Sequence, residues 1–305
     1  MEALLSKVLN DCSGFIAQGE VANYIPVLAE ADKNAFGICL ISNDNVLHSV
    51  GDSNTHFTMQ SIIKPIILLM ALMDNGAEVV RDLVGVEATG KPFDAFNYSD
   101  QALNGEHINP MINTGAIALC TLIKGQSYAE KFERLLNLAR KISGNPALSV
   151  DERVYLSEKA TGSKNRALAY MLKAYGMIHD DVEAVLDCYF RACSISATIV
   201  DLARIASVFA SGGVDISTGE QLFPKEYARH VNAVLMTCGM YDGSGEFALN
   251  VGVPAKSGVG GGIMAIVPGR MGIGIYSPAL DRKGNSVAGI KALEQLSASL
   301  DLSIF

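Results

Sequence analysis

The residues in this sequence best suited to chemistry are a serine and, three positions later, a lysine: Ser61 and Lys64. On a helix these positions share a face, so the hydroxyl and the amine can meet. A serine hydroxyl is a weak nucleophile at neutral pH, but a lysine among apolar side chains loses its charge more easily and can accept the hydroxyl proton. The adjacent Ile62, Ile63 and Ile66 would provide such surroundings. The pattern predicts a serine nucleophile with a lysine base.

Alone, this pattern is weak evidence, because a helix-capping serine and a lysine that extends to solvent would give the same sequence pattern. A second motif, Lys256-Ser257-Gly258, lies on a predicted strand near the C-terminus. Acyl-transfer enzymes of the β-lactamase and penicillin-binding type place a Ser-x-x-Lys helix beside a returning Lys-Ser/Thr-Gly strand, and this chain resembles them in that order. The resemblance implies a serine β-lactamase-like fold.

Across its whole length the sequence resembles the serine-dependent glutaminases more specifically. The segments that carry the resemblance are residues 23–26, 60–64, 109–117, 157–158, 165–166, 189–190, 193–195, 240–245 and 256–262. One departure is Thr114, where many members of the family carry alanine. The resemblance implies an amidohydrolase that acts on a linear amide: free L-glutamine is hydrolysed to L-glutamate and ammonia through an acyl-enzyme intermediate.

The resemblance also assigns catalytic roles. Ser61 would be the acylated nucleophile and Lys64 its base. Tyr24 and Tyr241 would border the serine and relay its proton or hold the substrate. The backbone amides of Ser61 and Val259 would form the oxyanion hole. Ser61, Tyr241 and Val259 would therefore contact the substrate as well, and the glycines around Val259 would allow close approach of the backbone to it.

Four further polar residues would bind the ends of the amino acid: Asn113, Glu158, Asn165 and Tyr189. A zwitterion needs one carboxylate for its ammonium group and several neutral donors for its own carboxylate, and this set provides both. Such a site rejects glutamine residues within proteins, because its polar groups would then remain unpaired. Each residue alone also fits an ordinary structural role: a packing tyrosine, a first-turn glutamate or a turn that starts a helix. Which residue contacts which end stays open.

Hydrophobic periodicity predicts an α/β (α+β) fold with an antiparallel sheet built from both termini and an inserted helical domain. We expect one part from residues 1–60 plus 245–305, a mainly helical part from 61–244, and the active site between them. The predicted elements are a first helix over about 4–16, a hairpin of strands 36–41 and 46–50, an apolar helix from 61 to about 74, helices 127–143, 163–175, 180–192 and 198–211, strands 254–257, 262–267 and 271–277, and a closing helix over 285–300.

Composition narrows the setting. The net charge of -8 argues against nucleic acid and anionic membranes as partners. The N-terminus lacks the basic start of a signal peptide, and the longest apolar run, 65–73, is too short to span a bilayer. We therefore expect a cytoplasmic protein whose six cysteines are buried thiols. The glutaminase family forms dimers or tetramers, so a homodimer or homotetramer is expected.

Neither a metal nor an organic cofactor is expected. The five histidines show no ligand spacing, and residues 258–262 do not continue into a G-x-G-x-x-G pattern. Ser99-Asp100-Gln101 resembles the Ser-Asp-Asn element of β-lactamases, but it lies too close to Ser61 and is interpreted as a loop. Two other functions remain open: a β-lactamase- or peptidase-like acyl hydrolase, and an amino-acid sensor without catalysis.

Overall fold

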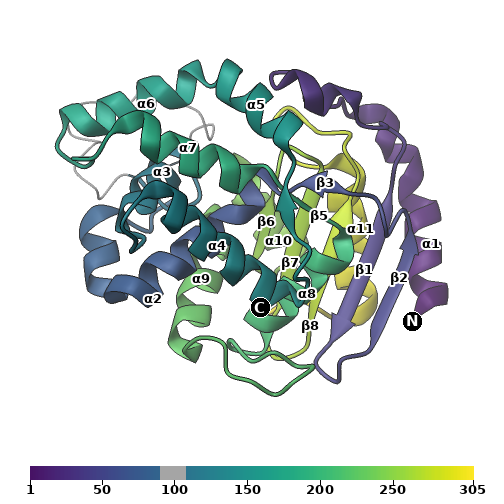
Figure 1. The fold of residues 1–305 in the computed structure, drawn as a ribbon. Helices are drawn as coiled ribbons and strands as arrows, with labels where there is room; N and C mark the ends of the chain where they lie inside the picture. The colour runs from purple at the N-terminus through teal and green to yellow at the C-terminus, as the bar shows by residue number, and fades with distance from the viewer. Residues whose placement is uncertain (90–107) are drawn as a thin grey trace.

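The computed structural model describes residues 1–89 and 108–305, and an antiparallel sheet lies at its centre (Figure 1). Five of the described strands form this sheet in the order β2-β1-β8-β7-β6. They are β1 (Gly37–Ser42), β2 (Leu47–Gly51), β6 (Ala255–Ser257), β7 (Gly262–Val267) and β8 (Met271–Tyr276). β1 pairs with β2 as the predicted hairpin and with β8 from the other end of the chain. The predicted sheet built from both termini is therefore confirmed.

Helices cover both faces of this sheet. On one face, α1 (Glu2–Ser13) and α11 (Val287–Leu300) pack together over the buried isoleucines of β8. On the other face lies α8 (Ile199–Ala210). β8 presents Gly272 and Gly274 to this helix, and a Cβ at either position would lie 2.2 Å from helix backbone. The glycines on one side of β8 therefore allow α8 to lie directly on the strand. The isoleucines on the other side fill the space beneath α1 and α11.

The middle of the chain forms a helical region that gathers beside the sheet in Figure 1. Predicted helices are confirmed there as α4, α6, α7 and α8, and α1 and α11 are confirmed at the two ends. Four of the described helices were not predicted by periodicity: α3, α5, α9 and α10. The bounds in this region are α2 (Lys64–Leu83), α3 (Asn113–Leu122), α4 (Tyr128–Ser143), α5 (Glu152–Thr161), α6 (Ser163–Ala174), α7 (Val182–Cys193), α9 (Lys225–Cys238) and α10 (Ser244–Asn250).

The apolar helix α2 departs from its predicted end. It was expected to stop near Asp74, but it kinks at Gly76, whose φ is +82°, and continues to Leu83. Its first two turns, Ile66–Leu72, are fully or almost fully buried. The helix therefore runs through the main hydrophobic core and anchors the residue at its start, Lys64.

A second, smaller sheet has the order β3-β5-β4 and was not predicted. Its strands are β3 (Phe57–Thr58), β4 (Ser149–Val150) and β5 (Ile195–Ala197), which are too short to show a period of two. Short 3-10 helices complete the described elements: η1 (Gly14–Gln18), η2 (Pro26–Glu30), η3 (Gln60–Ile63) and η5 (Tyr241–Gly243). Because β3 immediately precedes η3, this small sheet ties the chain before Ser61 to the helical region.

Several other sequence predictions can be placed on the structure. All six cysteines are free and buried, as expected. Among the described helices, none combines the length and apolarity needed to cross a bilayer. Residues 1–89 and 108–305 contain no group of three His, Cys, Asp or Glu arranged to hold a metal ion. The loop assigned to Ser99-Asp100-Gln101 lies outside the described residues, and the division into two domains stays a prediction.

Candidate active site

Ser61 lies on the single 3-10 turn η3, immediately before α2, rather than on an α-helix. The residue before it, Gln60, adopts a left-handed backbone with φ +49°, which is unfavourable by about 1–3 kcal/mol for a residue with a side chain. Two contacts hold this turn: Met59 N donates to Ile195 O at 2.8 Å, and Gln60 Nε2 donates to Thr58 Oγ1 at 3.2 Å. The chain is therefore bent sharply at the serine, and neighbouring elements fix the bend.

Lys64 is completely buried at the start of α2. Its Nζ donates to Asn113 Oδ1 at 2.7 Å and to Met111 O at 3.2 Å. Burial lowers its pKa from the ordinary 10.5 to about 8. Within residues 1–89 and 108–305, Ser61 Oγ is not among its hydrogen-bond acceptors. An uncharged amine has two N–H groups and one lone pair, so two carbonyl acceptors match this form and leave the lone pair available.

Tyr241 lies close enough to Ser61 for a hydrogen bond between the two side chains to lower the pKa of the tyrosine. It lies on η5 with a left-handed φ of +57°, and its hydroxyl donates to Ser257 O at 3.3 Å. Since that O–H is directed at Ser257, the phenol oxygen is the acceptor for the serine hydroxyl. Burial raises the pKa of Tyr241 well above its usual range, and the bonds to Ser61 and Ser257 only partly oppose this. The tyrosine therefore stays neutral and can pass a proton but cannot serve as a resting base.

A second buried amine, Lys256, lies under this tyrosine. Its Nζ is 4.1 Å from the centre of the Tyr241 ring and donates to Ser257 O at 2.7 Å and Gly239 O at 2.9 Å. Burial, together with the positive charge of Lys64, lowers its pKa well below the ordinary 10.5. Lys256 was not among the predicted site residues, although the Lys-Ser-Gly motif that contains it was recognised.

A cavity of about 390 Å³ opens beside Ser61. Six of the predicted site residues line it together: Tyr24, Ser61, Asn113, Glu158, Asn165 and Tyr189. Tyr24 is half exposed at the rim, whereas the other five are buried or partly buried. Residues from the start of α3, from α5, α6 and α7, and from the chain before η2 are thus brought to one hollow beside the serine.

The polar groups in this hollow form a chain that begins at Lys64. Asn113 Oδ1, which accepts from Lys64, also accepts from the Tyr189 hydroxyl at 3.2 Å, and Asn113 Nδ2 donates to Asn165 Oδ1 at 2.9 Å. Glu158 lies in the wall of the same cavity. Burial raises its pKa to about 8, against the lowering effects of a hydrogen bond from Gln60 and the charge of Lys64.

Glu158 carries the most informative feature of the cavity. Among the described residues, its Oε2 atom is buried and makes no hydrogen bond. Buried polar atoms normally have a partner, and an unpaired carboxylate oxygen facing a cavity suits an incoming N–H or ammonium donor. The wall therefore combines one acidic acceptor with amide and hydroxyl groups, as a small zwitterion requires.

Comparison with known proteins identifies the family. The sequence model of the family described as Glutaminase matches residues 19–305. A glutaminase of Clostridium tetani (strain Massachusetts / E88) is 52% identical over 305 residues, which cover 100% of both chains. A glutaminase of Clostridioides difficile (strain 630) is 53% identical over 304 residues, which cover 100% of this chain and 98% of that one. The chain belongs to the glutaminase family.

Solved structures agree with this assignment. A probable glutaminase from Bacillus subtilis, complexed with 6-diazo-5-oxo-L-norleucine, superposes with a TM-score of 0.90 at 39% identity over 98% of this chain and 94% of that chain. The covalent complex of a Bacillus subtilis glutaminase with 5-oxo-L-norleucine gives a TM-score of 0.91 at 38% identity, with coverage of 100% and 99%. The predicted glutaminase class of enzyme and its serine β-lactamase-like fold are confirmed.

Three predicted site residues of this glutaminase do not line the cavity of Ser61: Lys64, which is completely buried, Tyr241, which lines a separate hollow, and Val259. Val259 lines two other hollows, one of which it shares with Tyr24. The glycines around it were expected to allow approach to the substrate. Instead, a Cβ at Gly258 would lie 2.6 Å from Met59 O, and one at Gly260 would lie 2.6 Å from Thr58 O. They allow the returning strand to pack against the chain that leads to Ser61, and the oxyanion role of Val259 stays a prediction.

One further residue of the glutaminase site escaped sequence reasoning. Asn285, which is buried in the loop before α11, accepts from Ser257 Oγ at 2.5 Å and donates through Nδ2 to Met240 O at 3.2 Å. It therefore links the Lys-Ser-Gly strand to the strained turn that presents Tyr241. An asparagine in a loop that contains Gly284 is typical of any turn, so the sequence offered no signal for this role.

Proposed function

We propose that this glutaminase hydrolyses free L-glutamine to L-glutamate and ammonia through an acyl-enzyme on Ser61, with Lys64 as the base. The observation that carries the proposal is the composition of one cavity. Ser61 and Glu158, a buried carboxylate with an unpaired oxygen, line it, and Lys64, a buried lysine with a lowered pKa, lies one helical turn beyond Ser61 along the chain. The serine and the lysine suit acyl transfer, and the carboxylate suits an α-ammonium group.

The first half of the reaction forms the ester. As Ser61 Oγ bonds to the γ-carbonyl carbon, its proton passes to uncharged Lys64, directly or through the Tyr241 oxygen. The two N–H groups of Lys64 are directed at Asn113 and Met111, so its lone pair can take that proton. The same proton then moves to the amide nitrogen, the C–N bond breaks, and ammonia leaves. The backbone amides of Ser61 and Val259 would stabilise the oxyanion.

The second half releases glutamate. Water attacks the ester, gives one proton to Lys64, and the C–O bond to Ser61 breaks as this proton returns to the serine oxygen. The charge on Lys64 is created and removed inside a buried site, where its lowered pKa makes both transfers accessible near neutral pH. Two moderate barriers thereby replace the single high barrier of direct amide hydrolysis.

The cavity also supports the choice of a free amino acid as substrate. Glu158 would pair with the α-ammonium group, and the amide N–H groups of Asn113 and Asn165 would donate to the α-carboxylate. The Tyr189 hydroxyl, which donates to Asn113 Oδ1, would orient that amide. The ligand bound covalently to the Bacillus subtilis relative, 5-oxo-L-norleucine, is itself a free α-amino acid with a ketone where glutamine has its amide. A glutamine residue within a peptide would leave these polar groups unpaired.

The decisive test compares Ser61→Ala with the unchanged chain. Ammonia and glutamate release are measured with L-glutamine, L-asparagine, N-acetyl-glutamine and a penicillin. We expect turnover of L-glutamine alone, and loss of at least about 10³-fold of it in Ser61→Ala, with the melting temperature retained. Turnover by Ser61→Ala would disprove the nucleophile. Hydrolysis of the penicillin would favour the broader acyl hydrolase, and thermal stabilisation by glutamine without ammonia release would favour a sensor.

We also propose that the protein acts as a homodimer or homotetramer in the cytoplasm. Its six free, buried thiols suit a reducing compartment. Light scattering coupled to size-exclusion chromatography measures the oligomeric state directly: a mass of twice or four times 32.4 kDa is expected, and a single-chain mass would contradict it.

A further inference from the structure

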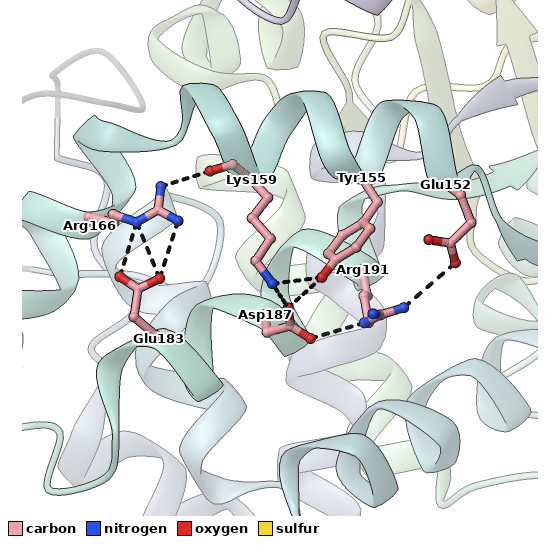
Figure 2. A network of polar contacts seen from close by, with 7 residues as sticks. All are labelled: Glu152, Tyr155, Lys159, Arg166, Glu183, Asp187 and Arg191. Carbon is pink, nitrogen blue, oxygen red and sulfur yellow. Dashed lines mark hydrogen bonds and ion pairs between the residues drawn. The ribbon is translucent and has the colours of Figure 1, made fainter.

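We infer that Asp187 is a positioning residue that sets the affinity for the substrate, because it joins α5 to α7, the helices that carry Glu158 and Tyr189. It is the centre of a polar network on the side chains of α5, α6 and α7, which Figure 2 shows and which we name the outer clamp. The inference rests on the proposed substrate site. Members of the outer clamp are Glu152, Tyr155, Lys159, Arg166, Glu183, Asp187 and Arg191.

The first arm of the outer clamp joins α5 to α7. Asp187 Oδ1 accepts from the Tyr155 hydroxyl and from Lys159 Nζ, both at 2.5 Å, and Oδ2 accepts from Arg191 Nε at 3.0 Å. The Arg191 guanidinium stacks 4.2 Å above the Tyr155 ring and reaches Glu152 at 3.6 Å. One carboxylate therefore receives three donors from two helices, and two of these donors are cations (Figure 2).

The second arm joins the start of α6 to both neighbouring helices. Arg166 Nη1 donates to Lys159 O at 2.8 Å, and its Nε lies 3.0 Å from Glu183 Oε1. Its guanidinium also lies 5.8 Å from the centre of the Phe190 ring. The turn between α5 and α6 fits tightly here, because a Cβ on Gly162 would lie 2.6 Å from the Phe190 ring. The two arms thus join α5 to α7, and α6 to both of them.

Residues of the outer clamp lie next to, or close to, residues of the proposed substrate site along the chain. Lys159 directly follows Glu158, Arg166 directly follows Asn165, and Asp187 lies two residues before Tyr189. Each proposed ligand points into the cavity while a chain neighbour points outward to the clamp. A small shift of one helix therefore moves its ligand by a similar amount, and hydrogen bonds tolerate errors of only about 0.5 Å.

The charges explain why Asp187 is the critical member. Although partial burial raises the pKa of its carboxyl, hydrogen bonds from Lys159, Tyr155 and Arg191 outweigh this and hold the pKa below its usual range. The carboxylate is therefore charged at neutral pH and offsets two cations, and without that charge these cations would repel each other. None of the seven clamp residues lies on η3, α2 or η5, the elements that carry Ser61, Lys64 and Tyr241.

The experiment compares two variants of matched chemistry. Asp187→Asn keeps the size of the side chain and removes its charge. Asp74→Asn is the control, since Asp74 also joins two helices and also receives three donors, two from Arg134 at 2.6 and 2.7 Å and one from Lys124 N at 2.8 Å. The measured quantities are kcat and KM for L-glutamine, the dissociation constant of the product L-glutamate by calorimetry, and the melting temperature.

We expect Asp187→Asn to raise KM and the glutamate dissociation constant by about 5–10-fold and to change kcat by less than about twofold. Asp74→Asn should lower the melting temperature but leave KM unchanged. An unchanged KM in Asp187→Asn, or an equal rise in the control, would overturn the inference, since the clamp would then have no specific effect on affinity. If Asp187→Asn does not fold, Glu183→Gln, which loosens only the second arm, should raise KM by about two- to threefold, and no rise would overturn the inference equally. These outcomes leave the proposed function intact, because it is tested separately, by turnover of L-glutamine and the loss of that turnover in Ser61→Ala.

Discussion

Two regions hold the groups around Ser61, and they do so by different interactions. We name them the strand wall (Tyr241, Lys256, Ser257 and Asn285) and the helix wall (Glu158, Asn165 and Tyr189 with the outer clamp). Hydrogen bonds within the strand wall are buried, and most of them end on backbone carbonyls. The helix wall is instead held from outside by ion pairs whose side chains are roughly a quarter to two thirds exposed.

This difference separates chemistry from affinity. Buried hydrogen bonds between fixed elements resist salt and small charge changes, whereas partly exposed ion pairs are screened and individually weak. Tyr241, which can pass a proton, therefore belongs to the rigid region, and Glu158, Asn165 and Tyr189, which select the ligand, belong to the adjustable one. Changes in the strand wall should alter kcat, and changes in the helix wall should alter KM.

The largest expected effect tests the catalytic amine. In Lys64→Met, kcat for L-glutamine should fall by at least about 10³-fold, because the amine that takes the proton of Ser61 is then missing. Glutamate binding measured by calorimetry should stay within about threefold, since Glu158 remains in place. A kcat near that of the unchanged chain would transfer the role of base to another group, with Lys256 the first to examine.

A smaller effect is expected from pH, and Lys64 and Glu158 both contribute to it. Lys64, with its pKa lowered to about 8, is increasingly uncharged as pH rises, and Glu158, with its pKa raised to about 8, is increasingly anionic over the same range. Both changes favour the active form. Hence kcat/KM should fall by at least about tenfold for each unit below pH 8, measured from pH 6 to 8.5.

The contribution of Glu158 to this profile can be separated. Glu158→Gln should bind substrate more weakly at every pH, and its kcat/KM should follow a single proton because only Lys64 still titrates. A flat profile between pH 6 and 8.5 in the unchanged chain would contradict both assignments, since neither group would then titrate where burial places it.

The smallest expected effect tests the strand wall without touching a reacting group. Asn285→Ala leaves Ser257 Oγ and Met240 O without their partner, so the Tyr241 turn should relax from its left-handed backbone. We expect kcat to fall by about three- to tenfold with KM changed by less than about twofold, the reverse of the result for Asp187→Asn. If kcat is unchanged while the melting temperature falls, Asn285 supports only the fold and the separation of the two walls is wrong.

Local patterns were sufficient for the parts of the molecule that local physics determines. The Ser61–Lys64 spacing, the hairpin, the helices with apolar residues three and four apart, and the buried thiols all follow from neighbours along the chain. α5 was missed because its sequence, Glu152–Thr161, has only a weak apolar stripe. Sequence alone also allowed Glu158 to be an ordinary glutamate in the first turn of a helix, whereas it lies in the second half of α5.

Long-range contacts explain what the sequence could not provide. The left-handed backbones of Gln60 and Tyr241 occur at residue types that rarely adopt this conformation, so only the surrounding structure accounts for them. Asn285 and Met240 are 45 positions apart, and the outer clamp joins side chains on three different helices. Neither arrangement leaves a local pattern. The place of Val259 beside the cavity, and not within its lining, is equally a matter of tertiary packing.

The tight fit of Gly258 and Gly260 against the carbonyls of residues 59 and 58 limits how this scaffold can change. A single added methyl group at either position would separate the returning strand from the bend that carries the nucleophile. These two pieces of chain, almost two hundred residues apart in sequence, therefore form one mechanical unit. Variants with an altered substrate range should consequently arise from substitutions in α5, α6 and α7, where a helix can shift without disturbing the nucleophile.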